Sequence, residues 1–191
     1  MRVAVFFAEG FEEIEALTVV DILRRAEVET HMVAVAEEAA PLTVTGSHGI
    51  TVTADTRITE TDFASLDMIV LPGGMPGTLN LEKSSILQMQ IKAFHEEKRT
   101  VAAICAAPGI LGRMGLLKGL QAVSHPSAED DLQGAEIPPL EEVVVSDHII
   151  TSRGMGTAIP FALQLVTELQ GREKADAIAK AICFRTDTTV V

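Results

Sequence analysis

Cys105 is the residue whose type and surroundings point most directly to chemistry. It follows a short apolar run, Thr100–Ile104, that has the character of a buried strand, and small residues follow it. A helix is expected from Ala106, with Pro108 at a position where its missing N–H costs nothing. Comparable strand–turn–helix junctions present the nucleophilic serine of α/β hydrolases. A thiol at a helix N-terminus faces unpaired N–H groups, which favour the thiolate. The sequence therefore predicts a reactive cysteine, with a buried structural cysteine as the alternative.

Glu15 is the best candidate for a partner of this thiol. It lies on a helical face whose other members are mostly apolar and expected to point inward: Phe11, Ile14, Thr18 and Ile22. A carboxyl group on such a face is costly unless it has a partner or keeps its proton. A protonated Glu15 that donates a hydrogen bond to the Cys105 thiolate would satisfy both groups. Glu12 and Glu13 are expected to be solvated carboxylates of the first helical turn.

His125 precedes Pro126 at the end of a short apolar run. Histidine is well suited to act as a general base or proton shuttle near neutral pH, so His125 is a candidate catalytic residue. The alternative is a histidine that merely ends a strand. The remaining histidines have no motif around them.

Two glycine-rich loops complete the candidate site. The loop that contains Gly73 and Gly74 could direct backbone N–H groups at a developing oxyanion, together with the N–H of Ala106. The alternative is a tight turn that needs glycine dihedrals and nothing more. In the second loop, Arg153 could pair with an anionic substrate or with a carboxylate across a subunit boundary, or it could simply be solvated.

The elements that must position these residues alternate between strand and helix patterns, which predicts an α/β fold with a mainly parallel sheet. Strands are expected at 2–7, 30–35, 67–71, 100–104, 121–124, 143–145 and 149–152, and helices at 12–26, 85–97, 106–114, 158–169 and 173–184. Residues 42–54 alternate around Gly-Ser-His-Gly and predict a small hairpin. Ligands bind beyond the carboxyl ends of parallel strands, and the candidate residues follow several of those ends.

The whole chain limits the possible classes of function. Its 191 residues predict one domain over 1–191, and the net charge of −12 argues against stable nucleic-acid binding. Neither a signal peptide nor a membrane-spanning segment is expected. The two cysteines lie outside any metal-binding spacing, which predicts no structural metal and a reducing, cytoplasmic environment. Cys183 is expected to pack on an apolar helix face with Ile178, Ala179 and Ile182.

Taken together, the motifs resemble the ThiJ/PfpI superfamily, in the branch that contains YajL and the Parkinson's-disease-linked protein deglycase. The resemblance is carried by Ala8–Glu15 (AEGFEEIE), Leu71–Gly74 (LPGG), Ala103–Pro108 (AICAAP), His125-Pro126 and Thr151–Thr157 (TSRGMGT). These motifs run in order from the first strand to the penultimate helix, so the resemblance covers nearly the whole chain.

The resemblance implies a flavodoxin-like three-layer sandwich, with helices on both faces of the sheet, and a homodimer. It implies that Cys105 is the nucleophile, Glu15 its protonated partner and His125 the nearby histidine. The backbone of Gly74 and Ala106 would supply oxyanion contacts, and Arg153 and His48 would lie near the site or the dimer boundary. Some members of the branch have arginine where this chain has His48, which puts anion recognition at that position in doubt.

The resemblance also implies an activity. Members of this branch are described as cofactor-independent glyoxalases, as deglycases that act on glyoxal adducts of proteins or nucleotides, and as oxidation-regulated chaperones. We expect a cysteine-dependent enzyme acting on glyoxal and methylglyoxal, free or as adducts, with protection against oxidative stress. The alternative is a redox-sensing chaperone that works through oxidation of Cys105. A role in thiazole monophosphate (thiamine) biosynthesis has less support. Proteolysis is disfavoured because Ala106 stands where protease-like relatives have a histidine.

Overall fold

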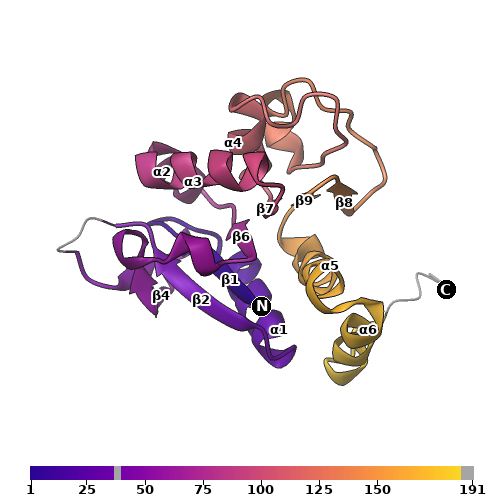
Figure 1. Ribbon diagram of the computed structural model, residues 1–191, viewed down its shortest axis with the longest axis horizontal. Helices are drawn as coiled ribbons and strands as arrows, with labels where there is room; N and C mark the ends of the chain where they lie inside the picture. The colour runs from indigo at the N-terminus through magenta and orange to yellow at the C-terminus, as the bar shows by residue number, and fades with distance from the viewer. Residues whose placement is uncertain (37–39, 186–191) are drawn as a thin grey trace.

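The computed structural model describes residues 1–36 and 40–185, and these form a seven-stranded sheet with helices on both faces (Figure 1). The strand order is β5-β2-β1-β6-β7-β9-β8, and every neighbouring pair is parallel except the last, β8 and β9. The strands are β1 (Arg2–Phe7), β2 (Glu29–Ala34), β5 (Thr56–Arg57), β6 (Met68–Leu71), β7 (Thr100–Ile104), β8 (Val143–Ser146) and β9 (Ile149–Ser152). The expected mainly parallel α/β fold is confirmed.

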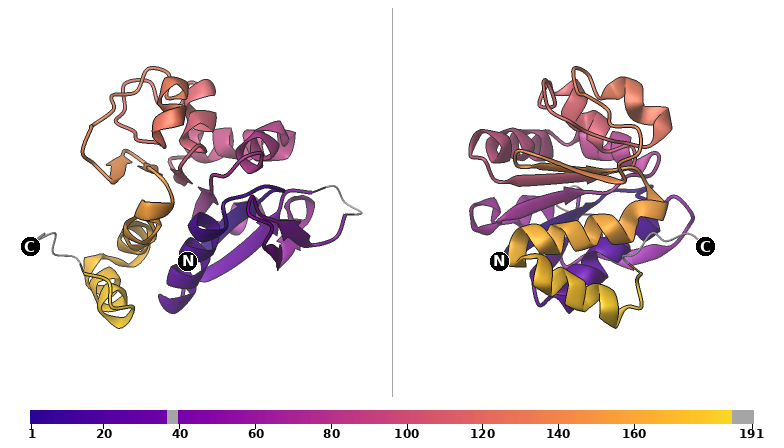
Figure 2. Two further views of the ribbon diagram at one scale, coloured as in Figure 1. Left: turned by 180° about the vertical axis from the view of Figure 1, so that it is seen from behind. Right: turned by 90° about the vertical axis from the view of Figure 1, so that its right-hand side faces the viewer.

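The helices divide into two layers, one on each face of the sheet, as the right-hand view of Figure 2 shows. One layer contains α1 (Glu13–Arg25), α5 (Ala158–Gln170) and α6 (Arg172–Ala181). The other contains α2 (Gly77–Lys83), α3 (Ser85–Glu96) and α4 (Pro108–Arg113). The resulting three-layer arrangement is that of flavodoxin-like folds.

The central strands show why the sheet needs cover on both faces. In β1, Val3, Val5 and Phe7 belong to the core beneath α1 and α5, whereas Ala4 and Phe6 belong to the core beneath α3. All five are fully buried. Side chains of a strand alternate between faces, so an apolar run without polar interruptions predicts a strand covered on both sides.

The hairpin expected over 42–54 is confirmed as a separate antiparallel pair of short strands, β3 (Thr43–Thr45) and β4 (Thr51–Thr53). The turn end of the hairpin is tied to the β1–α1 connection through a bond from the Gly10 N–H to the Thr45 carbonyl, 2.8 Å. The hairpin therefore lies beside the residues that connect β1 to α1.

Residues 121–124 do not form the expected strand. Only Gln121 makes an isolated bridge, with Glu136. The Val123 N–H donates to the Thr151 hydroxyl at 3.0 Å, and the Gln121 N–H donates to Ser146 Oγ at 3.2 Å. The backbone N–H groups of Gln121 and Val123 are thus bound by side chains of β8 and β9. In a regular strand they would instead be bound by backbone carbonyls of a neighbouring strand.

The chain end also differs from expectation. Helix α6 stops at Ala181, and Cys183 lies beyond it with a φ of 59° and an exposed side chain. The expectation that Cys183 packs on an apolar helix face is wrong. A left-handed residue after the last turn is a common way to end a helix, and Cys183 is that residue here, so its side chain does not continue the apolar face of α6.

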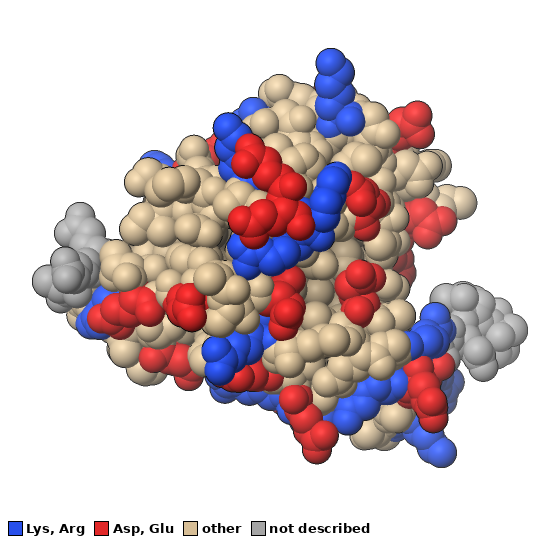
Figure 3. Space-filling model, in the orientation of Figure 1, with Lys and Arg blue, Asp and Glu red and all other residues tan. Residues whose placement is uncertain are grey.

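Charged side chains of both signs are interspersed over the face shown in Figure 3. Basic residues form no continuous stripe on that face, although such a stripe is what binding to a phosphate backbone requires. Among the described residues, no helix is long and apolar enough to cross a membrane.

Candidate active site

Cys105 lies on the sharp turn predicted between β7 and α4. Its backbone has a φ of 66°, a left-handed conformation that is uncommon for residues other than glycine and that is frequent at functional sites. Two backbone bonds hold the turn: the Cys105 N–H donates to the Ser152 carbonyl at 3.0 Å, and the Cys105 carbonyl accepts the His125 N–H at 2.8 Å. These bonds bring the ends of β7 and β9 and the residue His125 together.

The carboxyl group of Glu15 lies beside the Cys105 sulfur, as expected. Glu15 is 1% exposed, and its side chain forms a hydrogen bond with Cys105. Its Oε2 atom also accepts the Gly73 N–H at 2.9 Å. Glycine is required at 73 because a Cβ there would lie 2.7 Å from Glu15 Oε2 and 3.0 Å from Cys105 Sγ. The β6–α2 loop therefore closes directly over the pair.

Only part of the helical face that contains Glu15 points inward as expected. Phe11 and Ile22 are buried, but the side chain of Ile14 is 49% exposed. Glu15 is inward-facing because it lies at the carboxyl end of the sheet, under the β6–α2 loop.

Burial controls the protonation of both groups. It raises the pKa of Glu15 from 4.5 to about 7, and the charge of Glu12 acts in the same direction. Burial, together with the ionised carboxylate of Glu15, raises the pKa of the Cys105 thiol to about 12. Two backbone N–H groups, those of Gly74 and Ala106, point at the sulfur and lower its pKa in part.

This result corrects the expectation of an acidic thiol set by a helix N-terminus alone. A thiolate and an ionised Glu15 do not coexist near neutral pH, because two neighbouring negative charges in a buried site repel one another. Above about pH 7 the pair therefore holds one proton and one negative charge, and it titrates as a unit. Cys105 is a thiolate at neutral pH only where Glu15 keeps the proton.

The raised pKa of Glu15 has a measurable effect on stability. Between pH 4.5 and about 7 the folded protein binds a proton that the unfolded chain has released, so the free energy of unfolding falls as pH rises through this window. We expect a loss of ~3 kcal/mol that is absent from Glu15→Gln. Denaturant unfolding at the two ends of the window measures it, and equal slopes in both proteins would contradict the assignment. Glu13 does not interfere, because its pKa is lowered to about 2.

The N–H groups of Gly73 and Gly74, in the β6–α2 loop, have different partners. The Gly73 N–H is engaged by Glu15, whereas the N–H groups of Gly74 and Ala106 face the sulfur. Gly74 adopts a φ of 92°, which glycine reaches without steric cost. When the sulfur bonds to a carbon atom, an oxyanion on that carbon would lie close to the same N–H donors. The N–H groups of Gly74 and Ala106 are therefore the better candidates for an oxyanion site.

The site opens into a cleft of about 460 Å³ lined by the three expected catalytic residues, Cys105, Glu15 and His125. Their side chains converge on Gly154: a Cβ there would lie 3.7 Å from His125 Cδ2, 3.8 Å from Glu15 Oε1 and 4.0 Å from Cys105 Sγ. His125 is exposed, and Glu15 is fully enclosed. Sulfur, carboxyl and imidazole therefore line one small region of the cleft.

Arg153 lines the cleft, but its guanidinium group is directed into the connection between η3 (Pro126–Asp131) and β8. It donates to the carbonyls of Glu141 (2.7 Å) and Pro138 (2.8 Å) and pairs with Glu129 at 3.2 Å. The structure thus engages the Arg153 guanidinium in fixing this connection along one wall of the cleft, and pairing of Arg153 with a substrate anion stays a prediction.

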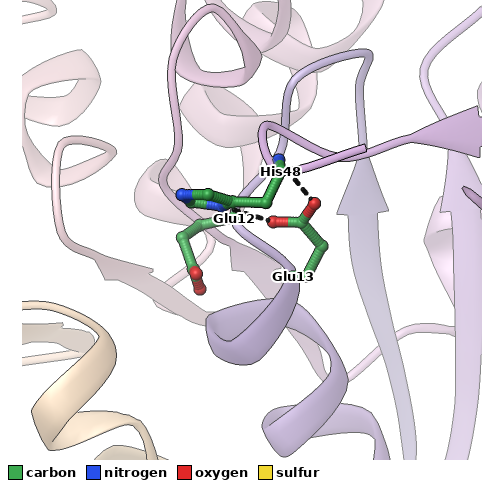
Figure 4. Close-up of side chains that lie close together, drawn as sticks. All are labelled: Glu12, Glu13 and His48. Carbon is green, nitrogen blue, oxygen red and sulfur yellow. Dashed lines mark hydrogen bonds and ion pairs between the residues drawn. The ribbon is translucent and has the colours of Figure 1, made fainter. Parts of the chain in front are cut away.

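Glu13 is a structural residue that the sequence reasoning missed. It was expected to be solvated, yet it is 2% exposed, and Glu12 is 9% exposed. Glu13 Oε1 accepts the His48 N–H at 2.7 Å, and Oε2 lies 3.0 Å from His48 Nδ1 (Figure 4). Burial opposes the charge, but these bonds dominate and lower the pKa of Glu13 to about 2. The same contact raises the pKa of His48.

Glu12, Glu13 and His48 bring three potential metal ligands within 4.8 Å of one another. However, both oxygens of Glu13 are already used: Ser47 Oγ (3.3 Å) and the Ile50 N–H (3.4 Å) add to the two contacts from His48. Glu13 is therefore a structural carboxylate that holds the loop of the hairpin in place through these hydrogen bonds. It anchors the wall of the cleft on which His48 lies.

Comparisons with known proteins agree with this fold. A family model described as the DJ-1/PfpI family matches residues 1–168. Protein DJ-1 homolog A of Arabidopsis thaliana is 38% identical over 182 residues, covering 94% of this chain and 45% of that protein. The glutathione-independent glyoxalase DJR-1.2 of Caenorhabditis elegans is 30% identical over 177 residues, covering 92% of each.

Among solved structures, oxidized DJ-1 of Toxoplasma gondii matches with a TM-score of 0.87 and 36% sequence identity, covering 96% of this chain and 98% of that one. The chain spans less than half the length of both Arabidopsis relatives, DJ-1 homologs A and B.

Proposed function

Because this chain belongs to the DJ-1/PfpI family, we propose that it is a cysteine-dependent enzyme that converts glyoxal and methylglyoxal without a cofactor. Its substrates would be the free aldehydes or their early adducts on the amines and thiols of proteins and nucleotides. One observation carries the proposal: the buried carboxyl of Glu15 is hydrogen-bonded to the Cys105 sulfur at the floor of an open cleft. The name of the Caenorhabditis elegans relative, a glutathione-independent glyoxalase, gives further support.

The proposed reaction begins with Glu15 protonated and Cys105 ionised. The sulfur attacks the aldehyde carbon, an S–C bond forms, and the C=O electron pair moves to oxygen. The N–H groups of Gly74 and Ala106 stabilise that oxygen, which takes the proton of Glu15 to give a hemithioacetal. The raised pKa of Glu15 suits this acid role near neutral pH.

For the free aldehydes, the Glu15 carboxylate then removes the proton from the carbon attached to sulfur. Return of that proton to the neighbouring carbon, with transfer of the hydroxyl proton from the first oxygen to the second, gives a thioester of a 2-hydroxy acid. Water cleaves the thioester, releasing lactate from methylglyoxal or glycolate from glyoxal and restoring the thiol. For an adduct, the sulfur forms its bond to the carbon that carries the amine or thiol while the C–N or C–S bond of the adduct breaks. The departing amine or thiol takes the proton of Glu15, and the same hemithioacetal results.

The test is the amount of hydroxy acid formed when the reduced, folded protein is incubated with methylglyoxal or glyoxal without glutathione. Product must be measured, because reversible hemithioacetal formation alone consumes aldehyde. We expect catalytic turnover, and competition with preformed adducts then separates glyoxalase from deglycase activity. Stoichiometric loss of aldehyde without hydroxy acid or released amine would contradict the proposal.

A second candidate is a redox-sensing chaperone. The hydrogen bond from Glu15 and the two N–H groups that face the Cys105 sulfur would also stabilise an oxidised sulfur at this position. The Toxoplasma gondii relative is described as oxidized. Intact mass after mild peroxide treatment tests this role. A gain of two oxygens confined to Cys105 is expected, and oxidation spread equally to Cys183 argues against a dedicated sensor.

We also propose that the protein is a homodimer in the cytoplasm, as members of this branch are described. Sedimentation velocity measures the oligomeric state directly, and a monomer at micromolar concentration would contradict the dimer.

A further inference from the structure

His125 makes two contacts through a single ring nitrogen. Its Nδ1 atom lies 2.8 Å from Ser127 Oγ and accepts the backbone N–H of Ser127 at 3.3 Å. The second contact caps η3, for which His125 is the N-cap residue. Because a backbone N–H can only donate, Nδ1 acts as an acceptor in this arrangement. The Ser127 hydroxyl is able to donate or accept and does not decide the matter.

The position of the accepting nitrogen determines where the ring carries its proton. A neutral imidazole has one N–H, so a ring that accepts at Nδ1 carries its proton on Nε2. The Nε2 edge faces the site: Cδ2, the atom next to Nε2, lies 3.7 Å from the Cβ position of Gly154, which is itself within 4.0 Å of Glu15 Oε1 and Cys105 Sγ. The cleft therefore receives a donor from His125.

We propose that His125 acts in the reaction as a hydrogen-bond donor through Nε2–H, and that Ser127 is the positioning residue whose backbone N–H fixes this tautomer. The inference rests on the proposed glyoxal chemistry. When the Cys105 sulfur bonds to the aldehyde carbon and the C=O pair moves to oxygen, Nε2–H stabilises that oxygen. The ring keeps its proton throughout, and Glu15 carries out both proton transfers.

This assignment differs from the general-base role that the sequence suggests for His125. A base would need its accepting nitrogen in the cleft, whereas here the accepting nitrogen is turned towards η3 and already bonded. The thiol proton consequently goes to Glu15, the group whose hydrogen bond with the sulfur is already formed.

The tautomer is measured directly by nitrogen NMR of the histidine rings in the full-length protein at a pH where the ring is neutral. The resonances of His125 are identified by their absence in His125→Gln. We expect an unprotonated Nδ1 and a protonated Nε2, in the wild type and equally in Ser127→Ala, which keeps the backbone N–H. A ring protonated on Nδ1 in the wild type, or a change of tautomer in Ser127→Ala, overturns the role of the Ser127 N–H.

Two substitutions separate a donor from a base by kinetics. The side-chain amide of Gln places an N–H near the position of Nε2, and that of Asn places its amide near Nδ1. For a donor, we expect His125→Gln to retain about ten times more kcat/KM for methylglyoxal than His125→Asn. The acid limb of the pH profile should persist in His125→Gln, because it then belongs to the Glu15–Cys105 pair. Equal losses in both variants, with that limb abolished, would show that His125 is a base.

The turnover measurement and the NMR measurement test different parts of the proposal. A wild-type protein that forms no hydroxy acid contradicts the proposed function and, with it, the donor role in that reaction. The NMR measurement does not depend on turnover, so an Nδ1–H ring overturns the assignment to Ser127 even in an active enzyme.

Discussion

Cys105→Ser is expected to lose at least about three orders of magnitude in the rate of hydroxy acid formation from methylglyoxal. A serine hydroxyl beside Glu15 has no accessible anionic form near neutral pH, and the N–H groups of Gly74 and Ala106 then stabilise no nucleophile. The variant should fold normally, because the smaller oxygen fits the half-buried position. Lactate measured over time, with thermal unfolding as a check on the fold, gives the result.

Cys183→Ser is the matched control. This second cysteine is exposed and lies beyond α6, so the substitution should leave turnover within about two-fold of the wild type. Lactate formation that survives Cys105→Ser, or that falls equally in Cys183→Ser, would exclude a mechanism based on a nucleophile at position 105.

Gly73→Ala is expected to be the single-methyl change that disturbs the reacting pair most directly. The added Cβ would lie 2.7 Å from Glu15 Oε2 and 3.0 Å from Cys105 Sγ, so the pair must separate or the β6–α2 loop must move. We expect a loss of roughly 1–3 kcal/mol in the free energy of unfolding, as for overpacked cores. Displacement of the reacting groups by about 1 Å should also reduce kcat/KM about 100-fold.

Gly156→Ala isolates the steric effect. Gly156 also lines the cleft, but a Cβ there has no heavy atom within 4 Å, so stability should change by less than about 0.5 kcal/mol. Denaturant unfolding and methylglyoxal turnover compare the two variants. Similar losses in both would show that the methyl group at 73 is accommodated and that the closeness of Gly73 to the pair is not what sets activity.

Much of the site could be predicted from the sequence because its signals are local. The strand before Cys105, the small residues after it and Pro108 at the start of α4 specify the turn within a short stretch. Glu15 was recognisable as a carboxyl on an otherwise apolar face. The parallel sheet then brings the ends of β1, β6, β7 and β9 to one edge, which follows from topology and not from any single residue.

The features that were missed depend on contacts between segments distant in sequence. Glu13 resembles any first-turn carboxylate until the hairpin loop folds over it and supplies donors from Ser47, His48 and Ile50. Arg153 resembles a solvated loop residue until its acceptors arrive from the connection before β8. The pKa of Cys105 was misjudged because the helix N-terminus was considered without the ionised neighbour and the burial that oppose it.

The central claim is that Glu15 and Cys105 share one proton near neutral pH, and that the reactive form is the one in which Glu15 holds this proton and Cys105 is ionised. It is tested most directly by the rate at which a small alkylating reagent modifies Cys105 as a function of pH, followed by peptide mass. The account predicts that the rate rises to half of its plateau near about pH 7, where the pair gives up its first proton, because this ionisation creates a thiolate beside a protonated Glu15. A rate that remains low at neutrality and rises only above an ordinary thiol pKa of ~8.5, towards the value of about 12 for a thiol beside an ionised carboxylate, would contradict it.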